Sequence, residues 1–337
     1  HGGYFDLRAL APISARVPTV VTLHDMWLLT GHCAHSLACE RWRTGCGACP
    51  DLRLSPPVRR DATALNWRRK QETYRASALH IVTPSRWLRD KVGASMLAPY
   101  AASVRVIPNG VDTTIFRPGV RAAARQALGV PPDRTVVMLT AGSGGAMWTD
   151  DAMLIDTIGR LVARLPGALE FVAVGRDRSF AVRAPVTIRS VSADAAANMA
   201  DVYRAADLYL HAAHAATFPL AILEAMACGV PVVASAVGGI PEQVDGADVR
   251  ALQPGSVLPA NATGLLVSPG SAVDMAHAAE ALIAAHAARH AMGDNGVRRI
   301  QSQFTLTRQV DAYLEVYAAM LERAPQPLAA GTSVVRA

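Results

Sequence analysis

The sequence predicts an α/β protein with two domains, each built on a mainly parallel sheet. The first observation is composition: 337 residues, of which 51% are apolar and 18% charged, are enough to bury two sizeable cores. The second is that strand-like and helix-like segments alternate along the chain. The third is that residues 217–242 read in order as a helix, a short buried strand and a glycine loop.

The first predicted domain covers residues 1–112. A helix is expected from about Asp61 to Ala76, and a second helix after Ser85. The connection Pro108–Asp112 then leads into the next domain. The expected strands are Thr19–His24, Leu79–Thr83 and Val104–Ile107.

The second predicted domain covers residues 113–303 and alternates strands with helices in the manner of a Rossmann-like unit. Residues 304–324 have the apolar spacing of a closing helix, and the composition of residues 325–337 predicts a disordered tail. The expected strands are Thr135–Leu139, Leu169–Val174, Val186–Arg189, Leu208–His211, Pro231–Ala234 and Leu265–Val267.

The segment 217–242 contains two predicted helix starts. Thr217 is expected to cap the first helix with its hydroxyl, Pro219 fits the first turn, and Gly229 ends the helix. A second helix is expected to open at Pro241, directly after Gly238-Gly239.

These helix starts predict a binding site for a nucleotide diphosphate. Free N–H groups at Phe218-Pro219-Leu220 and at Gly238-Gly239 suit phosphate oxygens. The carboxylate of Glu224, one turn into the first helix, suits the vicinal hydroxyls of a ribose. An ordinary β-α-β unit with a structural Gly-Gly turn is the alternative.

The same segment resembles the signature of the family-4 retaining glycosyltransferases of the GT-B superfamily. That pattern is Glu, seven residues, Glu, a run of small residues, Gly-x-Pro-Val-Val and Gly-Gly-x-Pro-Glu. Glu224 stands at the second Glu, and the other matching positions are Met226, Ala227, Cys228, Gly229, Pro231, Gly238, Gly239, Pro241 and Glu242.

The resemblance implies two Rossmann-like domains that face a cleft. It also implies transfer of a sugar, with retention, from a nucleotide-diphosphate donor to a glycan or lipid-linked glycan acceptor, in surface polysaccharide synthesis. No catalytic cofactor is expected in this mechanism. The family's first domain opens with a strand and a glycine-rich loop, and nothing before Val17 resembles them, so we expect that domain to be incomplete, with an unpaired sheet edge.

Two departures from the family pattern affect the expected site. Ala216 stands where the family has its first Glu, which contacts hydroxyls of the donor sugar. The loop Thr140–Asp151 lacks the family's Arg and Lys-Gly, so that only backbone N–H groups of Gly142, Ser143, Gly144 and Gly145 remain to hold phosphate, opposed by Asp150 and Asp151. A plain strand-to-helix turn is the alternative for this loop. A catalytically degenerate nucleotide-binding or glycan-binding relative is therefore the main rival function.

Three residues of the first domain are expected at the cleft. His24 follows a strand at its carboxyl end, and the resemblance places it near the donor sugar and acceptor, where it would act as the catalytic residue. It could instead end the strand by bonding to the backbone. Ser85 and Asn109 match family segments that line the cleft, although Ser85 also reads as a helix N-cap and Asn109 as part of a turn with Gly110.

Four of the five cysteines form a candidate metal site: Cys33, Cys39, Cys46 and Cys49. Cys-x-x-Cys presents two sulfurs to one ion, and a second pair can complete a tetrahedral structural zinc site. His32 and His35 are competing ligands, and reduced thiols or a redox disulfide are the alternatives. Cys228 lies apart from this group and is expected to be a small residue of the core. A metal-stabilised scaffold protein that does not bind nucleotide is a further rival function.

Charge is concentrated between Arg41 and Lys91, where twelve Arg or Lys and four Asp or Glu give +8, against +6 for the whole chain. Such a surface attracts an anionic membrane or a phosphate-linked acceptor, unless it is simply a solvated face. Nucleic acid is not expected, because no stacking motif accompanies the charge. No apolar run has membrane-spanning length, so we expect a cytoplasmic protein that works in solution or at the inner face of the membrane. A sugar-nucleotide epimerase of similar fold is a further rival to the glycosyltransferase function.

Overall fold

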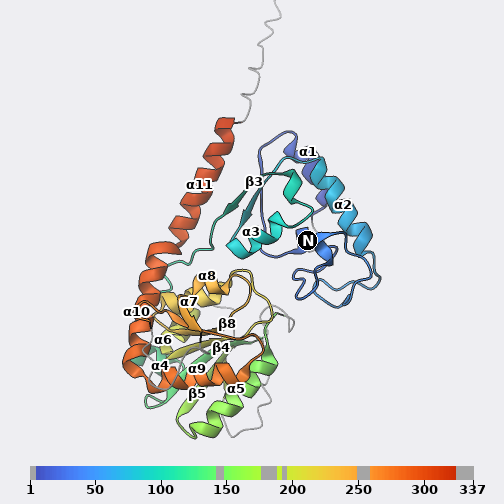
Figure 1. The fold of residues 1–337 in the computed structure, drawn as a ribbon. Coiled ribbons are helices and arrows are strands. Elements are labelled where there is room, and N and C mark those ends of the chain that lie inside the picture. The colour runs from blue at the N-terminus through green and yellow to red at the C-terminus, as the bar shows by residue number, and fades with distance from the viewer. Residues whose placement is uncertain (1–4, 142–147, 176–187, 192–195, 249–258, 324–337) are drawn as a thin grey trace, which may run out of the picture.

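The computed structural model describes residues 5–141, 148–175, 188–191, 196–248 and 259–323. Within these ranges the chain forms two α/β domains, and every strand pair is parallel. Figure 1 shows the N-terminal domain beside the long helix α11 (Leu306–Arg323) and above the larger C-terminal domain. The predicted α/β fold with parallel sheets is therefore confirmed.

The N-terminal domain has a sheet of order β1-β2-β3, in which β1 pairs only with β2 among the described residues. Its core includes the fully buried side chains of Trp42, Tyr74 and Leu88. The elements are η1 Leu7–Ala9, α1 Leu10–Ser14, β1 Thr19–Thr22, η2 Trp27–Leu29, η3 Arg41–Arg43, α2 Thr63–Arg75, β2 Leu79–Thr83, α3 Arg86–Gly93, η4 Ala98–Tyr100 and β3 Ala101–Val106.

The C-terminal domain has a sheet of order β6-β5-β4-β7-β8-β10-β9. Its strands are β4 Thr135–Ala141, β5 Leu169–Gly175, β6 Ile188–Val191, β7 Leu208–His211, β8 Val232–Ser235, β9 Gly246–Asp248 and β10 Gly264–Val267. Its helices are α4 Arg121–Ala127, α5 Asp151–Arg164, α6 Ala196–Ala205, α7 Leu220–Ala227, α8 Ile240–Gln243, α9 Ala272–Ala284 and α10 His286–Gln303.

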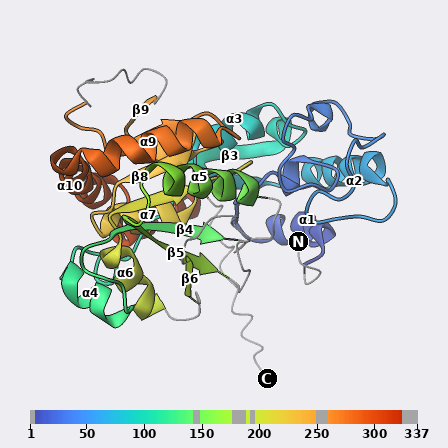
Figure 2. The same ribbon diagram turned by 90° about the horizontal axis from the view of Figure 1, so that it is seen from below.

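Helices cover both faces of this sheet, which explains why its central strands are continuous apolar runs. One core packs α6 and α7 against the sheet, and the other packs α5 and α9 against the opposite face. Figure 2 shows the strands between α5 and α9 on one side and α4 and α6 on the other. Because helices cover both faces of the sheet, we expect a ligand to bind at the loops beyond the carboxyl ends of the strands.

The strands β2 and β7 have the predicted bounds, whereas other ends differ. β1 ends at Thr22 instead of His24, and β3 begins at Ala101 instead of Val104. The strand β9 was not predicted, because Gly246–Asp248 has neither alternation nor β-branched residues. The predicted disordered tail lies outside the described residues.

The chain crosses between the domains twice, and the two crossings are hydrogen-bonded to each other. Val111 donates its N–H to the Phe304 carbonyl at 2.9 Å and accepts from the Leu306 N–H at 3.0 Å. A Cβ on Gly110 would lie 2.4 Å from the Thr305 carbonyl oxygen, so only glycine permits this approach. Beyond the second crossing, α11 packs on the N-terminal sheet, with Val316 and Met320 in a shared apolar cluster.

Candidate functional site

The larger sheet has a topological switch point between β4 and β7. From β4 the chain adds β5 and β6 on one side, and then returns to place β7 on the other. Ligands of open α/β sheets bind at the carboxyl ends of strands beside such a point. Here the connections that follow β4 and β7 are joined by a bridge between Thr149 and Ala213 and by the His214 N–H, which donates to the Trp148 carbonyl at 2.9 Å. This edge of the sheet is the candidate site.

The helix α7 begins at this edge, although not with the predicted cap. Its N-cap is Pro219, without a side-chain hydrogen bond, and the buried Thr217 hydroxyl has no partner. The prediction that Thr217 caps the helix is therefore wrong, because the cap position lies two residues later. The N–H groups of the first turn, from Leu220 onward, have no partner inside the helix. Gly229 ends the helix at φ +78°, as predicted.

Phe218 and Asn109 fix the start of α7 against the domain connection. The Asn109 side-chain amide donates to the Phe218 carbonyl at 3.1 Å, and the buried Phe218 ring contacts Phe304 with centroids 5.7 Å apart. Pro219 is half-buried and its carbonyl accepts from Gln243, whereas the Leu220 side chain is exposed. The structure thus brings Asn109 to the predicted phosphate-binding turn.

Gly238 and Gly239 permit a close approach of two backbone segments. A Cβ on Gly238 would lie 1.7 Å from the Ala216 carbonyl oxygen, and a Cβ on Gly239 would lie 2.0 Å from that of Thr217. The Gly239 N–H donates to Ala216 at 3.2 Å, and the Ile240 N–H is also bonded within the turn. The prediction of a free amide is therefore wrong for Gly239, and the glycine pair permits the close approach of the segment before α7.

Glu224 lies one turn into α7, as predicted, and is half-buried. Its Oε2 accepts a hydrogen bond from the Tyr203 hydroxyl at 2.8 Å. Burial raises the pKa of Glu224, and the bond from Tyr203 opposes this by favouring the carboxylate. The acid is therefore held in one orientation while part of it remains accessible.

Glu242 joins the two domains, a role that the sequence did not indicate. Its carboxylate oxygens accept the backbone N–H groups of Arg86 and Trp87, each at 2.8 Å, and the Arg86 guanidinium lies 3.4 Å away. These are the first residues of α3, so an acid of the C-terminal domain meets the positive end of a helix in the N-terminal domain.

Ser85 is the N-cap of α3, as its alternative interpretation proposed. Its hydroxyl accepts from the Leu88 N–H at 3.2 Å, and the residue is completely buried. It lies at the domain interface, because a Cβ on Gly239 would come within 2.8 Å of the Ser85 Cβ. Ser85 therefore supports the interface through the backbone of α3.

His24 is exposed at the end of β1 and lines a cavity of about 590 Å³. Every residue that lines this cavity belongs to the N-terminal domain. The adjacent Asp25 is half-buried, and burial raises the pKa of its carboxyl group. Among the described residues no hydrogen bond, ion pair or ring contact connects His24 to the C-terminal domain, so its predicted catalytic role rests on the resemblance.

The loop after β4 is only partly described. Gly142, Ser143, Gly144 and Gly145 lie outside the described residues. Asp150, which was expected to oppose a phosphate, is the N-cap of α5: its Oδ1 accepts from the Met153 N–H at 3.0 Å, and its Oδ2 lies 3.5 Å from His214.

The cysteine-rich segment folds around one small cavity. Cys33, Cys39, Cys46, Cys49 and His32 all line a space of about 20 Å³. His32 Nε2 lies 3.3 Å from Cys49 Sγ, and the Gly31 N–H donates to Cys46 Sγ at 3.3 Å. The four thiols are free, and no group of His, Cys, Asp or Glu side chains in the described ranges is arranged to hold a metal ion as it stands. Cys228 is buried in the C-terminal core, as predicted.

His35, from the same segment, reaches the domain interface. Its ring contacts Trp148 of the C-terminal domain edge-on, with centroids 4.7 Å apart, and lies 6.2 Å from Trp87. The sequence suggested His35 only as a competing metal ligand, and neither tryptophan stood out. No local pattern identifies such residues, because the contact joins positions that are far apart in the chain.

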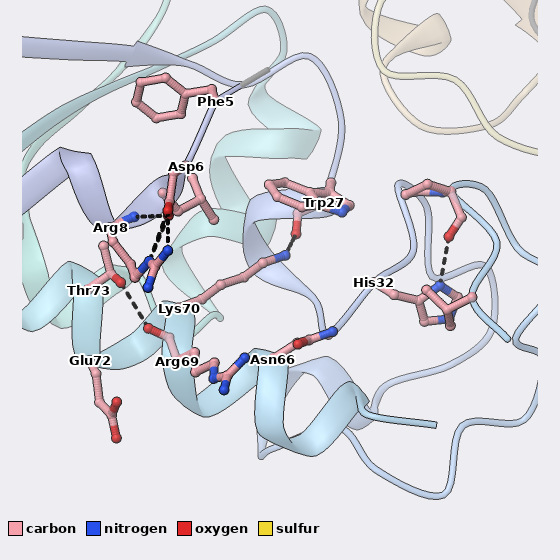
Figure 3. A pocket seen from close by; sticks show the side chains of 14 residues that line it. Phe5, Asp6, Arg8, Trp27, His32, Asn66, Arg69, Lys70, Glu72 and Thr73 are labelled. Atoms are coloured by element: carbon pink, nitrogen blue, oxygen red, sulfur yellow. Dashed lines mark hydrogen bonds and ion pairs between the residues drawn. The ribbon is translucent and has the colours of Figure 1, made fainter. Parts of the chain in front are cut away.

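A larger cavity, of about 870 Å³, lies between η1 and α2, away from the switch point. Figure 3 shows Lys70 extending from α2 toward Trp27 across its floor. Lys70 Nζ donates to the carbonyls of Trp27 and Thr30, the latter at 2.9 Å, and burial lowers its pKa to about 7. These bonds tie α2 to the turn after β1, which is a structural role.

Ion pairs neutralise part of the charge of the basic segment 41–91. Five of its cations are in ion pairs with Asp or Glu, and Lys70 is buried: the pairs are Arg43–Glu40, Arg53–Asp51, Arg86–Glu242, Arg89–Asp90 and Lys91–Glu40. Among the helices of the described ranges, none combines the length and the apolar character needed to cross a membrane.

Two family models match separate parts of the chain. Residues 1–115 match the family model described as Glycosyltransferase Family 4, and residues 137–285 match the one described as Glycosyl transferases group 1. The D-inositol 3-phosphate glycosyltransferase of Saccharomonospora viridis is 34% identical over 231 residues, which are 64% of this chain and 50% of that protein. The protein of the same name from Actinosynnema mirum is 33% identical over 233 residues, 64% of this chain and 52% of its own. The chain thus spans about half the length of these relatives.

Solved structures show the fold. Anabaena HepE in complex with UDP-glucose aligns with a TM-score of 0.66 at 20% identity, over 93% of this chain and 77% of its own. Sucrose-phosphate synthase from Thermosynechococcus elongatus aligns with a TM-score of 0.60 at 24% identity, over 79% of this chain and 65% of its own. The chain therefore has a GT-B-like α/β fold, and its two domains match two different glycosyltransferase family models.

Proposed function

We propose that this protein transfers a sugar, with retention, from a nucleotide-diphosphate donor to a glycan or lipid-linked glycan, in the synthesis of a surface polysaccharide. The observation that carries the proposal is the arrangement at the switch point. There the unbonded first turn of α7 and the carboxylate of Glu224 belong to one helix at the carboxyl edge of the sheet. The two family matches support the same reaction class.

In the proposed mechanism the diphosphate binds at the start of α7 and the ribose at Glu224. The N–H groups of the first turn and the helix dipole stabilise the negative charge that develops on the leaving diphosphate. Gly142–Gly145 would add backbone donors from the neighbouring connection. His24 would contact the sugar or acceptor from the other domain, and domain closure would exclude water.

The names of similar proteins guide the choice of the first donors and acceptors to test. HepE was solved with UDP-glucose, which makes UDP-sugars the first donors to test. The D-inositol 3-phosphate glycosyltransferases carry a phosphorylated acceptor in their name, so a phosphate-bearing acceptor is the first to test here. The basic segment 41–91 would attract such an acceptor, or the inner face of a membrane that holds a lipid-linked one.

A thermal-shift screen of UDP, GDP and ADP and their sugar esters tests the donor site, followed by transfer assays with the best donor. Glu224→Gln should weaken nucleotide binding by about 10-fold or more, because a hydrogen bond to a charged group is lost. Glu280→Gln, which neutralises a half-buried acid paired with Arg164 on another helix, is the matched control. Equal affinity of the Glu224 variant and the parent protein would contradict the ribose assignment.

A degenerate binding protein is the second candidate, favoured by Ala216 at the position of the family's sugar-binding acid. It predicts tight nucleotide binding with neither transfer nor donor hydrolysis. Ala216→Glu is the informative variant, because restoring the acid should raise turnover in a weak enzyme and leave a pure binding protein inactive.

We also propose that Cys33, Cys39, Cys46 and Cys49 bind a structural Zn²⁺. The donor set supports this, since soft thiolates around one cavity are the ligands that zinc prefers in structural sites. The thiols would have to rotate toward one another, because they do not converge as they stand. Metal analysis of the purified protein should find zinc that is lost in Cys39→Ser and retained in Cys228→Ser, the control in the other domain. Absence of zinc from the parent protein, with disulfides found by mass mapping, would refute the proposal.

A further inference from the structure

We infer that His35 is a sugar-contacting residue, whose Nδ1 forms a hydrogen bond with a hydroxyl group of the transferred sugar. The inference rests on the proposed function and deepens it, by assigning a residue of the cysteine-rich segment to the recognition of the donor sugar.

The backbone around His35 is fixed beside the carboxyl end of β1. The Met26 N–H donates to the Ala34 carbonyl at 2.7 Å, and the Ala34 N–H donates to Ser55 at 2.7 Å. The segment therefore passes directly next to Asp25, whose charge acts on the His35 ring. His35 is consequently placed by the N-terminal sheet and not by a free loop.

The ring of His35 lies where the two domains meet. Trp148, its edge-on neighbour, comes from the connection after β4 in the C-terminal domain. Trp87, its other neighbour, lies in the first turn of α3, whose N–H groups Glu242 binds across the interface. The carboxyl ends of β1, β2 and β4 thus lead to one point, and in the proposed reaction that point separates the donor diphosphate from the acceptor domain.

His35 Nδ1 is buried without a hydrogen-bond partner, in a residue that is only 8% exposed. Such an atom is costly, because the desolvation penalty of an unsatisfied polar group is not recovered. Two other side chains with such an atom, Thr149 and Thr217, lie in the segments that follow β4 and β7. An unpaired polar atom at the contact between the domains is consistent with a polar ligand.

The surroundings of His35 favour a sugar over a phosphate. Two indole rings provide apolar surface beside it, and aromatic faces with one placed polar group suit a ring of hydroxyl and C–H groups. A phosphate would instead require cations or a helix start, which α7 supplies elsewhere in the site.

The test compares His35→Phe with His80→Phe. His35→Phe keeps an aromatic ring between the tryptophans and removes both nitrogens. His80 is a half-buried histidine of the same domain whose Nδ1 bonds Ser103 within the sheet, so it controls for a general loss of imidazole. Titration calorimetry measures the affinity of each variant for UDP and for UDP-glucose, or for the best pair from the donor screen. His35→Asn, which retains a hydrogen-bonding group, is the second variant in case the phenylalanine protein does not fold.

We expect His35→Phe to bind the nucleoside diphosphate as the parent does and to bind the nucleotide sugar about 10-fold more weakly, since one buried hydrogen bond is lost. We expect His35→Asn to recover part of that loss. In protein labelled with ¹⁵N-histidine, the His35 signals should shift with the nucleotide sugar and not with the diphosphate alone. Unchanged sugar affinity in His35→Phe, or equal shifts with both ligands, would overturn the inference alone. Failure of the parent protein to bind any nucleotide would overturn the proposed function and this inference together.

Discussion

Replacing Gly239 by Ala should separate the glycine loop from the segment before α7. The added Cβ would lie 2.0 Å from the Thr217 carbonyl oxygen, about 1.4 Å short of ordinary contact, and 2.8 Å from the Ser85 Cβ. Neither neighbour is the end of a flexible side chain. One is backbone and the other is a buried cap residue of the opposite domain, so the backbone itself has to move.

The contacts of Gly239 give the free-energy cost of this backbone movement. Overpacking of a tight interior typically costs about 1–3 kcal/mol. The shift also lengthens the bond from the Gly239 N–H to the Ala216 carbonyl, now 3.2 Å, which adds about 1 kcal/mol. A total of about 2–4 kcal/mol lowers the melting temperature of a domain of this size by roughly 5–15 °C.

Gly159→Ala is the matched control, because a Cβ on Gly159 in the middle of α5 would meet nothing within 4 Å. It should be neutral or stabilise by about 0.5–1 kcal/mol, since alanine favours a helix over glycine. Both variants are compared by calorimetric unfolding and by nucleotide affinity. If Gly239→Ala has the melting temperature and the nucleotide affinity of the parent protein, the close packing of the two loops does not require a glycine at this position.

Three further outcomes are expected. Glu242→Gln should weaken the domain contact by about 1–3 kcal/mol, because a charged acceptor at a helix start is lost, whereas Glu280→Gln, at a half-buried acid away from the interface, should not; equal urea midpoints of unfolding for the two variants would refute this. Burial lowers the pKa of His211 to about 4, so the unfolded state binds the extra proton between pH 6.5 and 4, and stability present above that window should fall by up to about 3 kcal/mol through it. His211→Asn should flatten that decline, and a parallel profile would contradict the assignment. Tyr203→Phe should raise the pKa of Glu224 further and move the acid limit of nucleotide affinity to higher pH; an unmoved limit would count against the Tyr203 bond.

Most strands of the C-terminal sheet could be predicted from local sequence patterns, because a strand buried on both faces has to be an apolar run. The strands β5 and β7 are apolar runs between turn residues, and burial on both faces leaves few other interpretations. Boundaries were less predictable where hydrogen bonding decides them: β1 stops at Thr22 although the apolar pattern continues to Leu23. The three-residue strand β9 exists only because β10 lies beside it.

The candidate site was predictable only where its chemistry is local. Glu224 lies in α7 as its spacing required, whereas the cap at Thr217 failed because the chain before α7 is held by Gly239 and Asn109 from other segments. The domain-bridging role of Glu242 was hidden within a matching motif, since its partners are N–H groups of a distant helix. Contacts between domains have no periodicity in the sequence, and only the assembled structure reveals them.

The paired crossings of the chain determine how the domains can move. Because Val111 and Thr305 lie in register and are bonded on both sides, the two segments bend together instead of sliding past each other. Gln309 accepts the Gly110 N–H at 2.9 Å and secures α11 to the same point. The two crossings and the start of α11 therefore form one bonded unit, at which any rotation between the domains would be centred.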